Sequence, residues 1–347
     1  MTGAHRDIRL EALEAWLGSV LPAPMAAIAS ASSDASFRRY FRVTLAEPVA
    51  TPDRTARAAT LIAMDAPPPH EDCRPYVAAA KLLAAAGLHA PAILATDLER
   101  GFLLTTDLGT RMYLDALDEE SAPKLYRDAC GALVRWQLAS RENVLPPYDQ
   151  TLLKRELALF PDWYVAKHLA LEVTAEQRAT LDAAFELILA NNLAQPRVFV
   201  HRDYHSRNLM VTDPNPGVLD FQDAVYGPIT YDLVSLLRDA YVEWDEERQL
   251  DWAARYWEHA RDAALPVATD FSAFWRDFEW MGVQRQLKVL GIFTRLYHRD
   301  GKGAYLKDMP RVMRYLRGAC ARYRELFPLA RLLDQLEQRQ PVAGYTF

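Results

Sequence analysis

The segment 198–224, VFVHRDYHSRNLMVTDPNPGVLDFQDA, constrains the fold of this chain more than any other feature. Residues 198–200 form a short β-branched and aromatic run, which is typical of a buried strand that leads into a polar loop. Two further apolar runs, 209–211 and 218–219, are separated by residues that favour turns. We therefore expect these two runs to pair as a hairpin after the loop.

The hairpin is expected to fold Asp220 back over the loop that carries Asp203 and Asn208. Carboxylate and amide oxygens are ligands that Mg²⁺ prefers, and a second carboxylate can accept the proton of an attacking hydroxyl group. The order His-Arg-Asp, four residues and Asn is that of a kinase catalytic loop. At average residue usage it arises by chance with odds of about 10⁻³. The segment therefore predicts phosphoryl transfer from a nucleotide, with His201 as a structural residue of the loop.

A zinc site is the alternative hypothesis for the same segment. His201, Asp203 and His205 alternate along the chain and could bind zinc. This hypothesis leaves Asn208 and Asp220 without a function, whereas phosphoryl transfer uses both of them. We therefore favour phosphoryl transfer and assign no role to His205.

Length and composition are those of an ordinary globular protein. The 347 residues are many for one hydrophobic core, and the net charge of −6 predicts no binding to nucleic acid. The three cysteines lack metal-site spacing and favour a reducing compartment. Leucines at helical spacing over 10–21 indicate an amphipathic helix and no signal peptide, and no apolar run is long enough to span a membrane. We expect a cytoplasmic monomer that acts on a small molecule.

Apolar alternation and turn residues predict a small N-terminal sheet. Strands are expected at 25–30, 37–45, 59–64, 93–95 and 102–104, with one main helix over 76–86. From residue 108 onward the pattern is helical, apart from the loop segment. The sequence thus predicts an α+β, protein-kinase-like fold of two lobes. Residues 1–106 would form a nucleotide-binding lobe with a small antiparallel sheet, and residues 107–347 a larger, mostly helical catalytic and substrate-binding lobe.

The loop motif and this architecture resemble the aminoglycoside phosphotransferase and choline kinase superfamily over nearly the full chain. Within it, the chain is most similar to the bacterial kinases that phosphorylate the anomeric hydroxyl of N-acetylmuramate and N-acetylglucosamine. Four strings carry this narrower resemblance: DASFRRYFR at 34–42, MDAPP at 64–68, LDFQDAVYGP at 219–228 and LGIFTRL at 290–296. The resemblance implies an ATP- and Mg²⁺-dependent sugar kinase of cell-wall sugar recycling.

The same resemblance implies functions for individual residues. Asp203 is the expected catalytic base, and Asn208 and Asp220 are the expected ligands of Mg²⁺. A connector between the lobes would meet adenine, and a loop after the first strand would cover the phosphates. The residues expected at these two places are Thr106 and Leu108 in the connector, and Ser33 and Ser36 in the loop.

The sequence departs from the superfamily at the third strand. That strand usually supplies a lysine to the nucleotide phosphates, and here Met64 occupies the expected position. The negative charge of the phosphates must still be countered. We therefore expect Arg38, Arg39 or Arg42 to replace the lysine, and at least one of the three to be an ordinary strand residue.

Asp232 follows the loop segment and opens a helix. An acid in the first turn is favoured by the helix dipole, while related kinases use an acid here to brace the backbone of the catalytic loop. Both interpretations stay open.

The residues that bind the acceptor are less clearly marked. The segment 281–302 carries five Lys and Arg residues against one acid, which favours a neutral or anionic acceptor such as N-acetylmuramate with its lactyl carboxylate. Arg285 and Lys288 share a helix face and could meet that carboxylate. Glu156 could accept hydrogen bonds from sugar hydroxyls, and Trp163 could stack on the ring. The alternative is a solvated face for the two cations and a place in the core for the aromatic residue.

Two other classes of function remain open. The first is another small-molecule kinase, acting on choline, homoserine, a ketosamine or an aminoglycoside; choline would require an aromatic cage. The second is a non-catalytic nucleotide-binding protein, which the missing lysine suggests. A scaffold has no need of Asp203, Asn208 and Asp220 together, so a catalytic function is favoured.

Overall fold

A computed structural model describes residues 7–33, 37–51, 57–68 and 70–338. The chain divides into two compact units, which comprise residues 1–111 with 210–223 (unit 1) and residues 112–209 with 224–347 (unit 2). The predicted boundary after residue 106 lies close to the first division. The sequence predicts that the segment 210–223 is part of the C-terminal lobe, but this segment groups with unit 1, where Phe221 packs on Tyr76 and Gly217 on Leu108.

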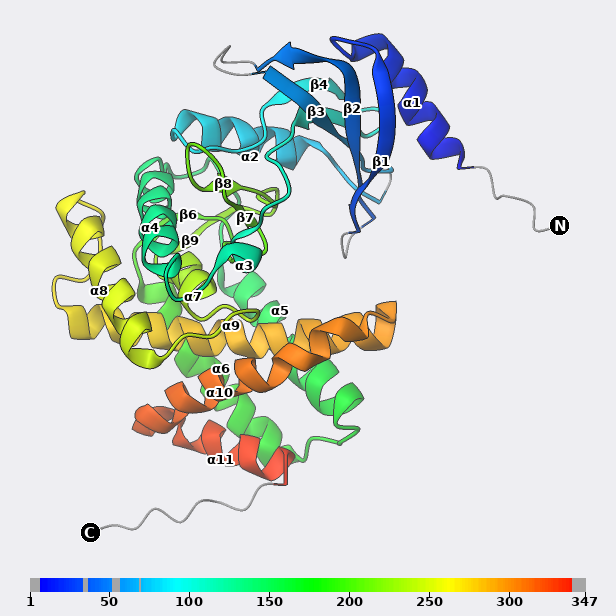
Figure 1. The fold of residues 1–347 in the computed structure, drawn as a ribbon. Coiled ribbons are helices and arrows are strands. Elements are labelled where there is room, and N and C mark those ends of the chain that lie inside the picture. Colours follow the sequence, from blue (N-terminus) through cyan, green and yellow to red (C-terminus); the bar gives the residue numbers. More distant parts are fainter. Residues whose placement is uncertain (1–6, 34–36, 52–56, 69, 339–347) are drawn as a thin grey trace. The chain divides into compact units, whose positions relative to one another are not determined.

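Unit 1 is built on a five-stranded antiparallel sheet in the order β1-β2-β3-β5-β4. Helix α1 lies along this sheet (Figure 1). The strands and helices predicted for this unit all occur, and all five strands of the sheet are longer than predicted. The elements are α1 (Ile8–Val20), β1 (Met25–Ser33), β2 (Arg39–Ala50), β3 (Arg57–Asp65), α2 (Arg74–Ala85), β4 (Ile93–Asp97), β5 (Phe102–Thr106) and β8 (Gly217–Val218).

The alternation of β2 explains how the sheet acquires its core. Phe41, Val43 and Leu45 point to one face and are buried. They pack in one apolar cluster with Leu13 and Leu17 of α1. Burying a side chain of this size stabilises a fold by about 1.5–3 kcal/mol. The predicted amphipathic helix therefore serves as one cover of the sheet.

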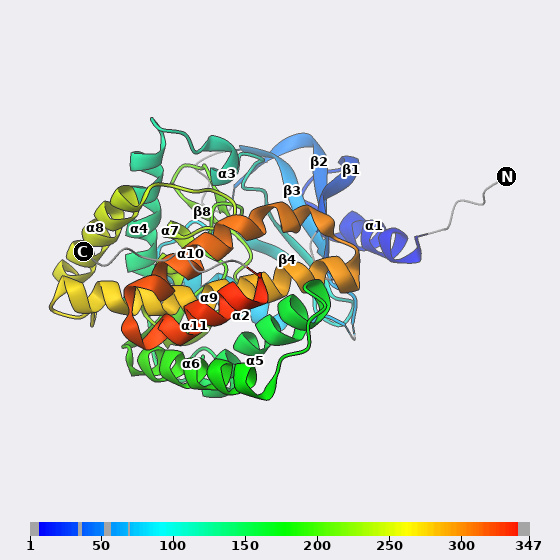
Figure 2. The ribbon, with the colours of Figure 1, turned by 90° about the horizontal axis from the view of Figure 1, so that it is seen from below.

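Unit 2 is mostly helical and is organised around the long helix α9 (Phe271–Asp300). Helices α5, α6, α7 and α10 and the π-helix η1 all pack against α9, and Figure 2 shows several of them alongside it. The other elements are α3 (Tyr113–Ala116), α4 (Ala122–Leu138), α5 (Gln150–Leu159), η1 (Phe160–His168), α6 (Ala175–Ala194), β6 (Arg197–Val200), β9 (Val225–Pro228), α7 (Tyr231–Leu237), α8 (Glu246–Asp262), η2 (Gly303–Asp308), α10 (Met309–Arg322), η3 (Arg324–Leu326) and α11 (Phe327–Leu336).

Gly291 allows a close approach of two elements within unit 2. A Cβ atom at this position would lie 2.5 Å from the carbonyl carbon of Leu159, at the junction of α5 and η1. Only a residue without a side chain fits at this crossing. The string that contains Gly291 therefore has a packing function in the fold.

The predicted hairpin is confirmed. Strand β7 (Leu209–Met210) pairs with β8, and the segment between them contains two cis prolyl bonds. Across the described part of the chain, no helix combines the length and the apolar character needed to cross a membrane. All three cysteines are buried free thiols, and burial raises the pKa of each.

Candidate active site

The loop after β6 is held by a buried acid. Strand β6 pairs with β9 and delivers the chain to His201. The carboxylate of Asp232, at the start of α7, accepts hydrogen bonds from the backbone N–H groups of His201 (2.6 Å) and Arg202 (3.0 Å). Asp232 is fully buried, and burial raises its pKa to about 7 against the opposing effect of these two donors. Of the two interpretations of Asp232, the bracing contact is therefore observed in the structure.

Asp203 is the first carboxylate of the loop and is half-buried. Its backbone N–H donates to Nδ1 of His201 at 3.3 Å, which agrees with a structural function for that histidine. Burial raises the pKa of Asp203, but nearby positive charges, above all Lys288, outweigh this effect and hold the pKa below its ordinary value. Asp203 is thus an ionised carboxylate that can accept a proton.

Asn208 closes the same loop. Its side-chain Nδ2 donates to the backbone carbonyl of Asp203 at 3.0 Å. Because the nitrogen of the amide is used in this way, its oxygen is the atom suited to a cation. The second half of the loop has a further brace, since Asp239 accepts from the backbone N–H groups of Ser206 (2.8 Å) and Tyr241 (2.9 Å).

Asp220 belongs to unit 1 and follows the hairpin. Its backbone has φ of +63°, a conformation that aspartate and asparagine adopt more readily than most residues. One carboxylate oxygen accepts a hydrogen bond from Gln222 at 2.7 Å. The next side chain, Phe221, packs on Tyr76 of α2 with ring centroids 4.6 Å apart. The turn therefore fixes the position of Asp220 beside α2.

The chemistry of these donors fits Mg²⁺ better than zinc. Asn208 of unit 2 and Asp220 of unit 1 each offer a hard oxygen ligand, and each of the two side chains is half-buried. Among the residues that the structure describes, no three His, Cys, Asp or Glu side chains gather where they could hold a metal ion. The zinc hypothesis for His201, Asp203 and His205 is therefore not supported.

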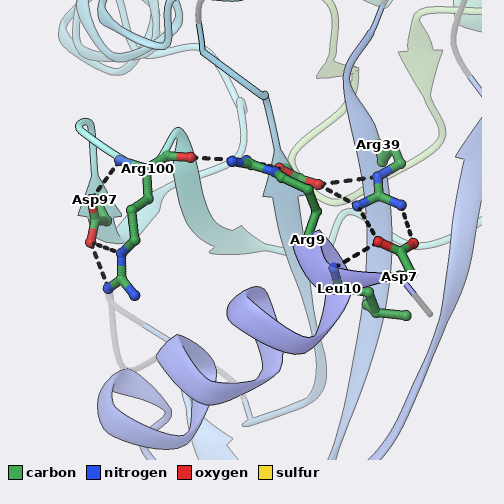
Figure 3. Close-up of polar contacts among 7 residues, drawn as sticks. Asp7, Arg9, Leu10, Arg39, Asp97 and Arg100 are labelled. Atoms are coloured by element: carbon green, nitrogen blue, oxygen red, sulfur yellow. Dashed lines mark hydrogen bonds and ion pairs between the residues drawn. The ribbon is translucent and has the colours of Figure 1, made fainter.

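Two of the three candidate arginines in unit 1 are occupied by carboxylates. Arg39 binds Asp65 (2.6 Å) and Asp7, and Arg9 of α1 binds the same fully buried Asp65. Figure 3 shows the guanidinium of Arg39 against the carboxylate of Asp7. Arg42 binds Asp107 through two nitrogens, at 2.6 and 3.1 Å. These pairs fasten α1 and the connector to the sheet.

Arg38 has different surroundings. Its Nε lies 3.9 Å from a carboxylate oxygen of Glu71, which precedes α2. Burial raises the pKa of Tyr76, while Arg38 lowers it and Asp220 raises it, so the cation and the candidate metal ligand both act on this one hydroxyl group. Of the three arginines, Arg38 is thus the one whose charge, like that of Asp220, acts on Tyr76 of α2.

The other predicted nucleotide contacts occupy ordinary places. Oγ1 of Thr106 accepts from the backbone N–H of Ala92 at 2.9 Å, and Leu108 packs against the backbone of Gly217. Ser33 ends β1, and its backbone pairs with Arg39. Ser36 lies outside the described residues.

Two predicted acceptor residues bind each other instead. Glu156 and Lys288 are both buried, with Nζ of Lys288 3.1 Å from the Glu156 carboxylate. The structure therefore places these two charges in an ion pair with each other, and their contact with a sugar stays a prediction. Trp163 lies half-buried in η1. Arg285 is buried and its charge lowers the pKa of Asp203, and its Nη1 has no hydrogen bond to any residue in the described ranges.

Three further residues at the site were not singled out by the sequence. Asp239 lies seven residues after Asp232, just beyond the end of α7 at Leu237, and no local pattern marks it as a second brace. Glu71 has no signal of its own in the sequence, and only the structure shows that it lies near Arg38. Arg202 is the middle residue of the His-Arg-Asp motif, and its side chain is part of the buried network around Glu156.

A five-stranded antiparallel sheet joined to a helical unit, with a doubly braced catalytic-type loop, defines the class of two-lobed, kinase-like phosphotransferases. The chain belongs to the phosphotransferase enzyme family, whose model matches residues 27–269. It is 50% identical over 342 residues to a Pseudomonas aeruginosa protein named N-acetylmuramate/N-acetylglucosamine kinase, covering 96% of this chain and 98% of that one. A Pseudomonas putida protein of the same name is 48% identical, with 96% and 98% covered.

The fold is also found among solved structures. The streptomycin–ATP–APH(2")-IIa ternary complex matches with a TM-score of 0.57 and 14% identity, over 90% of this chain and 97% of that one. At this identity the match supports the fold alone. The predicted two-lobed α+β architecture and the family are thus confirmed.

Proposed function

We propose that this protein transfers the γ-phosphoryl group of ATP to the anomeric hydroxyl of N-acetylmuramate or N-acetylglucosamine. The choice of acceptor rests on sequence similarity: about half of all positions are identical to those of kinases named for these two sugars, over nearly the whole of both chains. The observation that carries the chemistry is the ionised Asp203 in a loop braced by Asp232. The three free thiols fit a reducing compartment such as the cytoplasm.

In the proposed reaction Asp203 accepts the proton of the sugar hydroxyl. The hydroxyl oxygen forms a bond to the γ-phosphorus, and the bond from that phosphorus to the β–γ bridging oxygen breaks, which yields ADP and a sugar phosphate. Asn208 and Asp220 would hold Mg²⁺, which when bound neutralises charge on the phosphates. Arg38 would supply the charge that a third-strand lysine supplies elsewhere in the superfamily.

The surroundings of Asp203 favour a neutral or anionic acceptor. Lys288, Arg202 and Arg285 all act on its carboxylate. A polycationic aminoglycoside would meet repulsion from these groups. A choline cage is also disfavoured next to the loop, since Tyr241 and Tyr305 already hold the guanidinium of Arg207, 4.7 and 5.6 Å from their ring centroids.

The proposed function is tested by measuring ADP release with a panel of acceptors. The panel contains N-acetylmuramate, N-acetylglucosamine, choline, homoserine, a ketosamine and kanamycin. We expect turnover with the two amino sugars and a product whose phosphate is lost in mild acid, as for an anomeric phosphate. Turnover with only one of the other acceptors would replace the proposed substrate, and no turnover with any would favour a non-catalytic protein.

Substituting Arg38 with glutamine is expected to raise the KM for ATP by about tenfold, because a charge-assisted contact to phosphate contributes about 1.5–3 kcal/mol. Steady-state kinetics at saturating sugar measures this. Arg42→Gln is the matched control: its guanidinium is already bound by Asp107, so the KM for ATP should stay within about twofold of wild type. An unchanged KM for Arg38→Gln, or an equal rise in both variants, would remove Arg38 from the phosphate site.

Substituting Arg285 with glutamine is expected to discriminate between the two sugars. Only N-acetylmuramate carries a carboxylate, so its KM should rise by about tenfold while that of N-acetylglucosamine stays within about twofold. Arg299→Gln on the same helix, where Arg299 is exposed and paired with Asp300, serves as the control. Equal changes for both sugars would show that Arg285 does not read the carboxylate.

A further inference from the structure

Arg202, the residue before Asp203, has a backbone conformation that is unfavourable for an arginine. Arg202 has φ of +77°, in the left-handed region where a glycine carries no penalty and a residue with a Cβ does. Non-glycine residues persist in this region where the surrounding contacts over-determine them, and such sites cluster at functional positions. The contacts of Arg202 should therefore explain why an arginine occupies this position.

The side chain of Arg202 is held as firmly as its backbone. Its Nη2 lies 2.6 Å from Oε1 of Glu156, and its guanidinium lies over the ring of Tyr148, 5.6 Å from the centroid. The Tyr148 hydroxyl donates to the other oxygen of Glu156. Lys288 completes the cluster through Glu156, and its Nζ also donates to the Tyr231 hydroxyl at 2.9 Å.

These contacts come from three helices that meet at one peptide. Glu156 lies on α5, Lys288 on α9, and Tyr231 on α7 next to Asp232. Asp232 accepts a hydrogen bond from the backbone N–H of Arg202, while Glu156 accepts one from its guanidinium group. Both ends of Arg202 are thus fixed, and the direction in which the following residue leaves the loop is fixed with them.

We propose that Arg202, anchored by Glu156, is a positioning residue that aims the carboxylate of Asp203 at the acceptor hydroxyl. The inference rests on the proposed function, in which Asp203 accepts the proton of that hydroxyl. Reaction rates depend steeply on the geometry of the reacting groups, and a misplacement of 1 Å can reduce a rate by about 10²-fold. Glu156 and Lys288 then serve the reaction through Arg202, without contacting the sugar.

The substitution Arg202→Gly separates positioning from backbone conformation. Glycine adopts the left-handed conformation without strain, so the variant keeps the loop conformation accessible and removes only the anchor. We expect kcat to fall by about tenfold or more, with the KM values for ATP and sugar within about threefold of wild type. Arg202→Lys keeps a cation within reach of Glu156 and should recover part of kcat. Ala264→Gly is the matched control, since Ala264 has φ of +61° on an exposed turn after α8 and its substitution should leave kcat unchanged.

A second variant covers the case in which Arg202→Gly does not fold. Glu156→Gln keeps the shape of the anchor and removes its charge, and kcat should fall by about threefold or more at unchanged KM. A kcat within about twofold of wild type in a folded variant of either kind would overturn the proposal, and so would a tenfold rise in KM at unchanged kcat. Asp203→Asn, measured in parallel, distinguishes failure of the positioning role from failure of the proposed function. If Asp203→Asn also stays active, the proposed function fails. If Asp203→Asn is inactive while the Arg202 and Glu156 variants stay active, only the positioning role fails.

Discussion

Replacing Asp203 with asparagine is expected to reduce kcat by about 10²-fold or more, because the acceptor hydroxyl then loses the group that takes its proton. Asparagine has nearly the same shape, and the backbone hydrogen bonds of the loop come from Asp232 and His201 and remain in place. The KM for ATP should change little. Rapid-quench or coupled ADP-release kinetics measures the loss, and thermal unfolding checks that the fold is kept.

Asp213→Asn is the control for this substitution, since Asp213 lies exposed in the turn of the hairpin and has no proposed role. Its kcat should equal that of wild type. The pKa of Asp203 is lowered, so its carboxylate stays ionised at pH values where an ordinary aspartate begins to take up a proton. We therefore expect the kcat of wild type to show no loss from protonation of this group above about pH 5. A loss smaller than about threefold in Asp203→Asn would remove this residue from the mechanism.

Replacing Asp220 with asparagine is expected to abolish the dependence of nucleotide binding on Mg²⁺. Asparagine tolerates the left-handed backbone at this position, so the change removes a ligand charge with little strain. The loss of a charged ligand of the cation should lower kcat/KM for ATP by about 10³-fold, which corresponds to about 4 kcal/mol.

Calorimetric titration with a non-hydrolysable ATP analogue measures this effect directly. For wild type, the affinity in Mg²⁺ should exceed that in EDTA by tenfold or more, and for Asp220→Asn the two affinities should agree. Asp213→Asn should behave like wild type. If Asp220→Asn keeps the full gain in affinity from Mg²⁺, the proposed metal ligand is elsewhere.

Much of the fold follows from local sequence patterns. The strands of unit 1 alternate in polarity, as Phe41, Val43 and Leu45 illustrate, and the turn formers between β7 and β8 indicate a hairpin of short reach. The loop of Asp203 and Asn208 is likewise visible, since its residues lie within one short segment. Features of this kind depend on neighbours in the chain.

The remaining features depend on partners that are distant in the chain. Arg39 and Arg42 look equivalent to Arg38 in the sequence. Only the fold shows that strand pairing places Asp65 beside Arg39 and that the connector places Asp107 beside Arg42. Glu156 looks available to a sugar until Lys288 and Arg202 are placed beside it. The positive φ of Arg202 cannot be predicted from an arginine, whereas a glycine at this position would have suggested a left-handed backbone conformation.

The central claim is that Asn208 and Asp220 bind one Mg²⁺ while Asp203 contacts the acceptor. A crystal structure with Mg²⁺, a non-hydrolysable ATP analogue and N-acetylmuramate tests it most directly. We predict oxygens of Asn208 and Asp220 about 2.0–2.1 Å from the cation, and the Asp203 carboxylate about 2.6–3.2 Å from the anomeric hydroxyl. A cation bound without Asp220, or a sugar whose hydroxyl lies out of reach of Asp203, would contradict the account.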